Sequence, residues 1–458
     1  MNLLNEIKKI LSSLAKHKAV IAIVLLSLVL RGGYLIAIGF DKDAVENVIL
    51  YGDAKSYHLM ASGFLEKGEF YRAGVLDTQR TPGYMLFLSL IYCVFGVNPI
   101  IGALANILLS LLTVPLLYML IKRLSEEKTA IYGTLLYVLY PTAIFYSINL
   151  YSETLFVFFF ILSLNILIQA LDRANYRNFA FLGLSYGLLI LVRPLGQYFF
   201  AISILSFLIL SHEELINKIK QTVLAVSIVF IVLSPWQIRN YQLFGRYSLS
   251  ENSIYYSKLI EYIERYHGNS QENASNLSLK LIEDENPAPK NRFEIAEASK
   301  AALVKYILND PQTFISYYIK TMSRNYFTIG STNFLHSLGY INQMNAVDYR
   351  KINYANRFLE YLSEANKLQL SFFLVFFAYF MSVYILFCIG IIYILKNKNY
   401  KIAFIFLALI AVNTLVSGVL GDPRFNIPIM PLINVIAAYG MALMTSLFYR
   451  RNLKSIAR

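Results

Sequence analysis

The stretch "KAVIAIVLLSLVLRGGYLIAIGF" (residues 18–40) decides the fold class, because a helix of about 20 apolar residues spans the hydrocarbon core of a bilayer. Other runs have a similar length, and one of them, 178–211, is long enough to cross twice. These runs are residues 98–121, 129–147, 150–171, 178–211, 218–237, 369–395, 401–420 and 426–448. We therefore expect an all-α polytopic membrane protein with about 10–12 spans. Run 82–96 is too short for a clear span, so whether it crosses is left open.

The composition supports the same class. Of the 458 residues, 57% are hydrophobic and only 15% are charged, and one soluble core of this length could not bury so much apolar surface. The net charge of +13 does not require a nucleic-acid partner, because Lys and Arg gather in the cytoplasmic loops of membrane proteins. The first run lacks a small-residue cleavage site, so we expect it to be retained. Cys93 and Cys388 lie in apolar runs and are expected to be buried, without a disulfide or metal framework.

Basic residues predict the orientation. Clusters lie within 8–18, 122–128, 173–177, 218–220, 396–401 and 450–454, and placing all of them in the cytoplasm gives a consistent threading. Both termini are then inside, and the long polar region lies outside. The chain divides into an N-terminal membrane module (1–238) with an outer catalytic loop (41–81), an extracytoplasmic helical region (239–368) and a C-terminal module of three spans (369–458). Within the outer region, Asp310 followed by Pro311 predicts the start of a helix.

Under this threading, nine polar side chains fall in outer loops or at outer helix ends. They are Asp53, Lys55, His58, Asp77, Arg80, Glu153, Arg193, Arg239 and Arg424. Each taken alone is consistent with an ordinary solvated charge or a helix-end anchor. We favour a shared site for the set, because these loops are otherwise short and apolar and charges beside the bilayer are costly.

Carboxylates and arginines at a membrane surface suit one kind of chemistry. A carboxylate can act as general base on an acceptor hydroxyl or amine. Arginines can bind a phosphate bidentately and stabilise it as a leaving group. An apolar groove between helices would hold a lipid tail. The pattern therefore predicts a glycosyltransferase that uses a polyprenyl-phosphate-linked sugar on the extracytoplasmic face.

Several short motifs, each weak alone, follow one another in a characteristic order. They are "YGDAKSYHLMA" (51–61), "RTPGYMLFLSLIYCVFG" (80–96), "YPTAIFYSINLYSETLF" (140–156), "GLLILVRP" (187–194), "SPWQIRNYQLFG" (234–245) and "GDPRFNIPIMP" (421–431). In this order and spacing the chain resembles the polytopic GT-C-fold glycosyltransferases, and within them the branch of protein O-mannosyltransferases and lipid A aminoarabinose transferases. Met85 stands where that branch often has proline. The resemblance implies a GT-C-type transmembrane helix bundle with a small helical extracytoplasmic region.

The resemblance also implies roles for two carboxylates. Asp53 occupies the position of the family's catalytic aspartate and is expected to be the general base, although it also suits the N-cap of the following helix. Many relatives carry Asp-Glu at this point, whereas this chain has Asp53-Ala54. Glu153 is the candidate for the second carboxylate. The alternative for Glu153 is an acidic residue favoured in the first turn of a helix.

Four arginines are candidates for binding the donor phosphate. Arg80 and Arg424 match basic positions of the family, whereas Arg193 and Arg239 match less closely and could anchor helix ends. The secondary candidates are Lys55, His58, Asp77 and Trp236, the last being either an interfacial belt residue or a platform for sugar.

By resemblance, the reaction is an inverting transfer of sugar to a lipid, glycan or protein acceptor, on the periplasmic side of the inner (plasma) membrane. The chemistry requires no cofactor, and the His, Asp and Glu residues lack zinc or calcium spacing. Because some GT-C branches use a divalent ion, a metal at Asp53 and Glu153 stays open.

Two other functions also stay open. An O-antigen polymerase or ligase relies on a large outer loop with Arg and His and lacks an acidic first loop, so Asp53 argues against it. A transporter or flippase of lipid-linked sugars typically has inverted repeats and mid-membrane charges. This sequence keeps its polar candidates at one face and shows no internal repeat.

Overall fold

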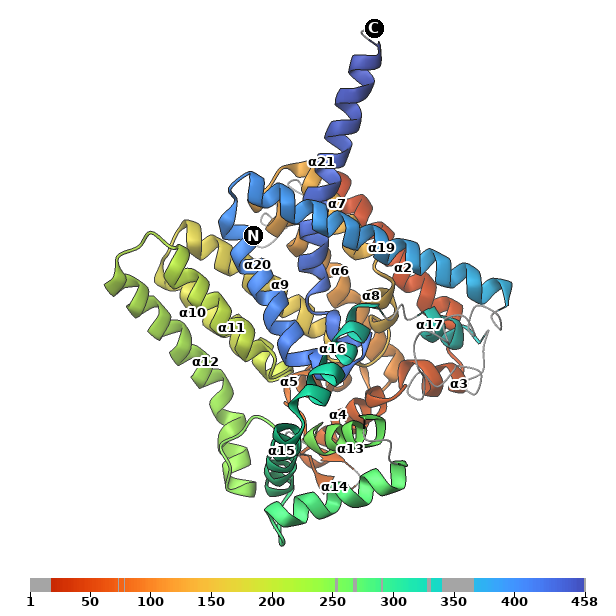
Figure 1. Ribbon diagram of the computed structural model, residues 1–458, viewed down its shortest axis with the longest axis vertical. Helices are drawn as coiled ribbons and strands as arrows, with labels where there is room; N and C mark the ends of the chain where they lie inside the picture. Colours follow the sequence, from red (N-terminus) through yellow and green to blue (C-terminus); the bar gives the residue numbers. More distant parts are fainter. Residues whose placement is uncertain are drawn as a thin grey trace.

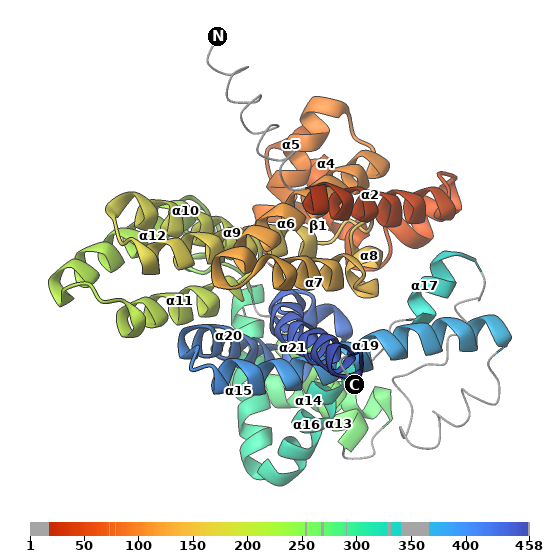
Figure 2. The same cartoon turned by 90° about the horizontal axis from the view of Figure 1, so that it is seen from above.

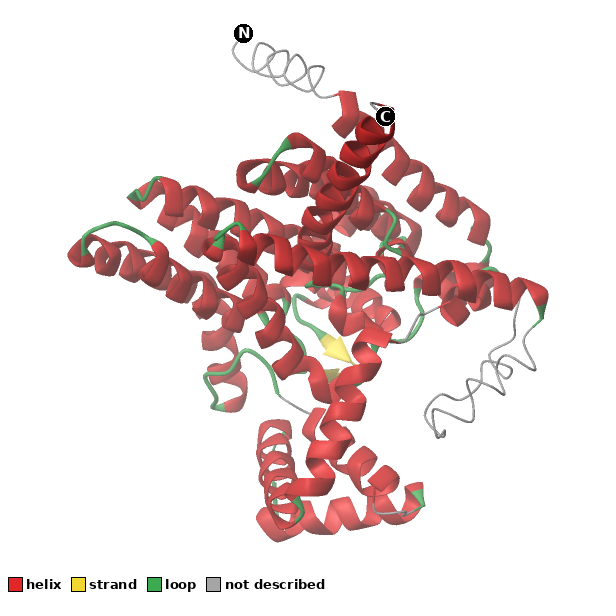
Figure 3. Ribbon diagram, turned by 45° about the horizontal axis from the view of Figure 1, so that its top comes forward, coloured by secondary structure: helices red, strands yellow, loops and turns green. Residues whose placement is uncertain are grey.

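The computed structural model describes residues 18–456 apart from residues 73, 78, 252–253, 267–269, 290, 328–330 and 340–365. Helices dominate the described part (Figure 3). Seven of them are long and apolar enough to cross a membrane: α2 (Lys18–Ile38), α6 (Pro99–Leu124), α9 (Glu153–Asp172), α12 (Leu215–Phe244), α19 (Lys367–Lys396), α20 (Tyr400–Ser417) and α21 (Met430–Ile456). Shorter apolar helices are α5 (Gly83–Phe95), α10 (Tyr176–Val192) and α11 (Gly196–Leu210). The predicted all-α polytopic membrane fold is confirmed.

Proline residues interrupt two of the predicted runs. Run 178–211, long enough to cross twice, forms two helices, α10 and α11, and the break between them lies at Arg193-Pro194. The expectation of one helix over 129–147 is wrong, because the run is divided into α7 (Glu127–Val138) and α8 (Pro141–Tyr146). Pro141 disfavours helical backbone at the preceding residue, and Tyr140 accordingly has a ψ of 110°.

A buried arginine inside α2 stabilises this break. Arg31 is fully buried, and its Nη1 donates to Ser27 Oγ at 2.8 Å and to the Val138 carbonyl at 3.4 Å. Val138 is the last residue of α7, so the guanidinium lies at a helix C-terminus, where a positive charge is favourable. We conclude that Arg31 fixes the end of α7 from a neighbouring helix.

The remaining described elements are mostly helical. They are α3 (Lys42–Ala44), the π-helix η1 (Val45–Ile49), α4 (Asp53–Lys67), β1 (Tyr71–Arg72), β2 (Val75–Leu76), α13 (Ile254–Tyr266), α14 (Gln271–Glu285), α15 (Arg292–Asn309), α16 (Pro311–Phe327), α17 (Ser331–Ser337) and the 3₁₀ turns η4 (Gly418–Leu420) and η5 (Pro423–Asn426). β1 and β2 pair antiparallel, with Tyr71 opposite Leu76. The predicted cap of α16 is confirmed, because Asp310 Oδ1 accepts from the Thr313 amide at 3.1 Å.

The helices have a clear spatial arrangement. Helices α13, α14 and α15 gather at the end of the molecule opposite the C-terminal end of α21 (Figure 1). Seen from above, α2, α4 and α5 lie across the molecule from α19, α20 and α21, with α6, α7 and α9 between them (Figure 2). A contact between α4 and η5 therefore connects the two sides of the molecule.

The predicted boundary at 238/239 falls within a helix. α12 continues through Pro235 to Phe244. The division into modules 1–238, 239–368 and 369–458 stays a prediction. Residues 340–365 of the outer region and residues 8–17 of the first basic cluster lie outside the described residues.

Helices α19 and α21 pack through two glycines. A Cβ at Gly390 would overlap the Ile436 carbonyl oxygen, and a Cβ at Gly440 would overlap the Leu386 carbonyl oxygen. Two backbones can approach this closely only where no side chain intervenes, as in small-residue contacts between membrane helices.

The burial predicted for the two cysteines is wrong. Cys93 and Cys388 are free and exposed on the protein surface. The reason is that a helix in a bilayer turns apolar side chains toward lipid as well as toward its neighbours, so an apolar run does not by itself indicate burial.

Candidate functional site

A tight turn at Gly52 places Asp53 at the start of α4. Gly52 has a φ of +60°, a region that glycine adopts without the steric cost of a side chain. A Cβ at Gly52 would lie 2.7 Å from Tyr151 Oη, which itself donates to the Tyr51 carbonyl at 2.8 Å. Gly52 is the N-cap of α4 and Asp53 is its first residue, so the alternative that Asp53 itself is the cap is wrong. Its carboxylate is therefore available for other partners.

Two arginines from distant parts of the chain bind Asp53. Arg80 Nη2 lies 2.7 Å from Asp53 Oδ1, and Arg424 Nη1 lies 2.9 Å from Asp53 Oδ2. Arg80 precedes α5, whereas Arg424 belongs to η5 between α20 and α21. The carboxylate thus joins the N-terminal and C-terminal parts of the membrane domain.

Arg424 continues the chain of charges to a second carboxylate. Glu153 is the first residue of α9, and its side chain is fully buried. Its Oε1 accepts from Arg424 Nε and from Arg193 Nη1, the latter at 2.6 Å. Arg193 follows α10 at the break before α11. We call the alternating series Arg80, Asp53, Arg424, Glu153 and Arg193 the charge ladder.

Aromatic rings support the guanidinium groups of the ladder. The Arg80 guanidinium lies 4.3 Å from the centre of the Tyr57 ring, and that of Arg424 lies 4.4 Å from the Tyr151 ring. Such cation–π contacts fix the plane of a guanidinium. Neither tyrosine is among the residues predicted from the sequence. Their spacing is the signal that could have identified them: Tyr57 lies one helical turn after Asp53, and Tyr151 lies two residues before Glu153.

The members of the ladder differ in exposure. The Asp53 side chain is 43% exposed, whereas the side chains of Arg80 and Arg424 are 13% and 15% exposed. Burial raises the pKa of Asp53, but the charges of Arg80 and Arg424 outweigh this effect and lower it to about 2. Burial also opposes the charge on Arg80 and Arg424, yet Tyr57 and Asp53 raise the pKa of Arg80, and Glu153 and Asp53 raise the pKa of Arg424. All three groups are therefore ionised at neutral pH.

Arg239, Asp77 and Trp236 form a separate contact beside the ladder. Arg239 Nη2 lies 2.7 Å from Glu69 Oε2, and its guanidinium lies 4.3 Å from the Trp236 ring. Trp236 is buried and donates through Nε1 to the Leu249 carbonyl at 2.7 Å. Asp77 is buried, and its Oδ2 accepts from the Arg80 amide at 3.3 Å. This group holds the loop that carries Arg80 against α12, and Glu69 is not among the residues predicted from the sequence.

Lys55 and His58 point away from the ladder. Lys55 Nζ forms an exposed ion pair with Glu46 at 2.8 Å. His58 Nδ1 lies 2.8 Å from Tyr92 Oη, and burial lowers the pKa of His58. Asp53 shares neither contact, as expected from their spacing on one helix.

The ladder does not offer a preformed site for a divalent metal. Among the residues that the structure describes, no group of three or more His, Cys, Asp or Glu side chains is placed to hold a metal ion. Asp53 and Glu153 each face two guanidinium groups, and the Arg424 guanidinium lies between them. These positive charges repel a cation, so the residues do not fit the metal left open by the resemblance.

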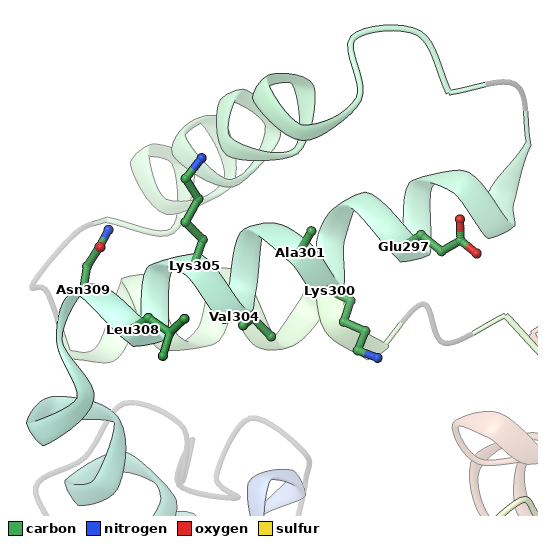
Figure 4. A pocket seen from close by; sticks show the side chains of 7 residues that line it. All are labelled: Glu297, Lys300, Ala301, Val304, Lys305, Leu308 and Asn309. Carbon is green, nitrogen blue, oxygen red and sulfur yellow. The ribbon is translucent and has the colours of Figure 1, made fainter.

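An apolar hollow of about 590 Å³ elsewhere in the molecule is not part of this site. Figure 4 shows its lining side chains, all of which come from α15: Glu297, Lys300, Ala301, Val304, Lys305, Leu308 and Asn309. A hollow lined by one helix face is a surface feature. Within the described residues, none of its lining side chains forms a hydrogen bond or ion pair with the ladder.

The two ends of α4 provide a matched test of how the turn is built. Gly52→Ala and Gly68→Ala both place alanine at a positive φ, +60° and +72°, but only the first meets another atom within 4 Å. We expect Gly68→Ala to lower the free energy of unfolding by about 1 kcal/mol. We expect Gly52→Ala to lower it by a further ~1–2 kcal/mol or more, because its added Cβ meets Tyr151 and because its ψ of −124° lies outside the left-handed helical region that Gly68 occupies. Thermal unfolding in detergent measures both, and equal losses would contradict the proposed contact.

Comparisons with known proteins agree with this architecture. Residues 79–238 match the model of the dolichyl-phosphate-mannose-protein mannosyltransferase family, a segment that includes Arg80, Glu153 and Arg193. A search of curated protein sequences found no match.

Solved structures are similar at low sequence identity. The archaeal oligosaccharyltransferase AglB from Archaeoglobus fulgidus, in complex with an inhibitory peptide and a dolichol-phosphate, has a TM-score of 0.52 and 13% identity, over 96% of this chain and 51% of that one. The apo form of the Archaeoglobus fulgidus oligosaccharyltransferase has a TM-score of 0.50 and 14% identity, over 96% and 52%. ArnT from Cupriavidus metallidurans, bound to undecaprenyl phosphate, has a TM-score of 0.45 and 13% identity, over 92% and 76%.

The chain spans about half the length of the two oligosaccharyltransferases. At these identities the likeness establishes the fold. The chain is therefore a multi-pass membrane protein with the fold of the GT-C glycosyltransferases, as the resemblance predicted, and its residues 79–238 carry the mannosyltransferase family model.

Proposed function

We propose that this protein transfers a sugar from a polyprenyl-phosphate-linked donor to a hydroxyl or amine of a lipid, glycan or protein acceptor. The charge ladder is the observation that carries the proposal. It places an ionised and accessible carboxylate, Asp53, directly between two arginines, Arg80 and Arg424. Arg424 connects it to Glu153, which is buried and paired with Arg193. The AglB complex holds a dolichol-phosphate, which supports a lipid-linked donor for this fold. We place the reaction on the extracytoplasmic face of the inner (plasma) membrane, in line with the positive-inside orientation.

The residues divide the reaction between them. Arg80 and Arg424 bind the donor phosphate, and Asp53 accepts the proton of the acceptor hydroxyl or amine. The acceptor atom forms a bond to the anomeric carbon while the bond from that carbon to the phosphate oxygen breaks. The lipid phosphate leaves with the electron pair, and the arginines stabilise its charge.

Glu153 acts as a positioning residue in this scheme. Its carboxylate is fully buried and already accepts from Arg193 and Arg424, so it has no room to attack the sugar. Without a second accessible carboxylate, the ladder favours a single displacement, which inverts the anomeric configuration. The acceptor attacks from the side opposite the leaving phosphate.

Donor binding provides the test of this assignment. Arg424→Gln should weaken binding of a radiolabelled polyprenyl-phosphate sugar by at least about tenfold, because it removes a charged hydrogen-bond donor. Arg246→Gln is the control, since its guanidinium forms an exposed ion pair with Glu297 away from the ladder. Its effect should be less than about threefold. Equal losses in both variants would contradict the proposed phosphate site.

Donor turnover separates a transferase from a transporter. With purified protein in nanodiscs and a membrane extract as source of acceptors, label should move from the lipid donor to an acceptor. A donor that binds but stays intact would favour the transporter or flippase.

A further inference from the structure

The net charge of the ladder depends on the state of Asp53. Three guanidinium groups and two carboxylates give a net charge of +1 when Asp53 is ionised and +2 when it carries a proton. The donor in the proposed function is a phosphodiester of charge −1. The product is a lipid phosphate monoester, whose charge is about −1.5 to −2 near neutral pH. The ionised ladder therefore matches the charge of the donor, and the protonated ladder matches that of the product.

Asp53 lies where it affects both ligands. Its side chain is 43% exposed, whereas the arginines on either side of it are 13% and 15% exposed. A phosphate that reaches these arginines must therefore lie beside the carboxylate. The charged groups facing Asp53 are Arg80 and Arg424, with the Tyr151 ring beside Arg424 and the Glu153 carboxylate beyond it.

We propose that Asp53, besides acting as the base, controls release of the lipid-phosphate product, an inference that rests on the proposed transfer reaction. In the transfer step the acceptor proton moves to Asp53, and the ladder holds the product at matching charge. With the phosphate on Arg80 and Arg424, Asp53 no longer has the two ion pairs that lower its pKa in the free protein, so it keeps the proton until water takes it. The ionised carboxylate repels the phosphate and forms its ion pairs with Arg80 and Arg424 again. The product then leaves.

Asp53→Asn mimics the protonated state, because asparagine is neutral and nearly the same shape. Binding is measured at pH 8 with two probes, farnesyl phosphate for the product and its methyl diester for the monoanionic donor. We expect Asp53→Asn to bind farnesyl phosphate about tenfold more tightly than the wild type and the diester only about threefold more tightly. Asp53→Ser, a second neutral variant, should behave like Asp53→Asn, whereas Asp53→Glu should behave like the wild type.

The control for a lost negative charge is Glu46→Gln, in the same loop and paired with Lys55 away from the ladder. It should change neither affinity. If both neutral variants bind farnesyl phosphate no more tightly than the wild type, the release role of Asp53 is overturned while the transferase proposal stands. If the wild type binds neither probe and transfers no sugar, the proposed function fails and this inference fails with it.

Discussion

Asp53→Asn is expected to lower the rate constant of sugar transfer by about a thousandfold, within the range for loss of a general base. Asparagine cannot accept the acceptor proton, although it keeps the size of the side chain. Steady-state transfer of labelled sugar measures the loss, with Glu46→Gln as the control that should retain full activity. A rate within about tenfold of the wild type would move the base to another group.

The pH dependence of transfer follows from the same residue. Because the pKa of Asp53 is about 2, the carboxylate is ionised over the whole neutral range. The folded value lies below the ordinary value of 3.8, so the ion pairs of Asp53 stabilise the fold above that pH, and this stabilisation is lost as the pH falls toward 2. We expect no Asp53 step between about pH 5 and 8 in kcat/KM for the donor, which follows the ionisation of the free protein. A step near pH 6 that disappears in Asp53→Asn would contradict the double pairing with Arg80 and Arg424.

Gly390→Ala is expected to cost about 3 kcal/mol of unfolding free energy, because overpacking forces α19 away from α21. The added methyl group would overlap the Ile436 carbonyl oxygen, and a backbone carbonyl in a helix cannot rotate aside. Gly440→Ala should behave in the same way against Leu386. Thermal unfolding and the fraction of monodisperse protein after purification measure the effect.

Gly33→Ala in α2 is the matched control for this prediction. A Cβ at Gly33 meets nothing within 4 Å, so the variant should be as stable as the wild type or slightly more stable through its higher helix propensity. If Gly390→Ala were as stable as Gly33→Ala, the close approach of α19 and α21 would be wrong.

The sequence predicts the membrane fold well because hydrophobic length is a direct physical requirement of the bilayer. It fails where a local rule interrupts an apolar run, as at Tyr140-Pro141. It also fails for Cys93 and Cys388, because apolar character does not distinguish lipid contact from burial. The buried Arg31 is visible in the sequence, but its contact with the end of α7 depends on helix packing.

The site is predictable in part because the predicted membrane topology places its residues on one side of the membrane. Five predicted residues do meet in the charge ladder, although Asp53 and Arg424 are 371 positions apart in the chain. Its charge and its predicted side of the membrane do not show that Arg239 lies outside the ladder. Arg239 instead pairs with Glu69, which lies two residues before β1. This pairing depends on how the loop around β1 and β2 folds. The sequence contains 35 tyrosines, and only their spacing from the two carboxylates distinguishes Tyr57 and Tyr151, whose rings support the ladder, from the others.

The most direct measurement of the central claim is a single-turnover reaction with donor preloaded on the wild-type protein, followed by NMR of the transferred sugar. A single displacement assisted by Asp53 predicts that the sugar reaches the acceptor with an anomeric configuration opposite to that in the donor. Retained configuration would contradict the assignment of Asp53 as base and Glu153 as a buried positioning residue.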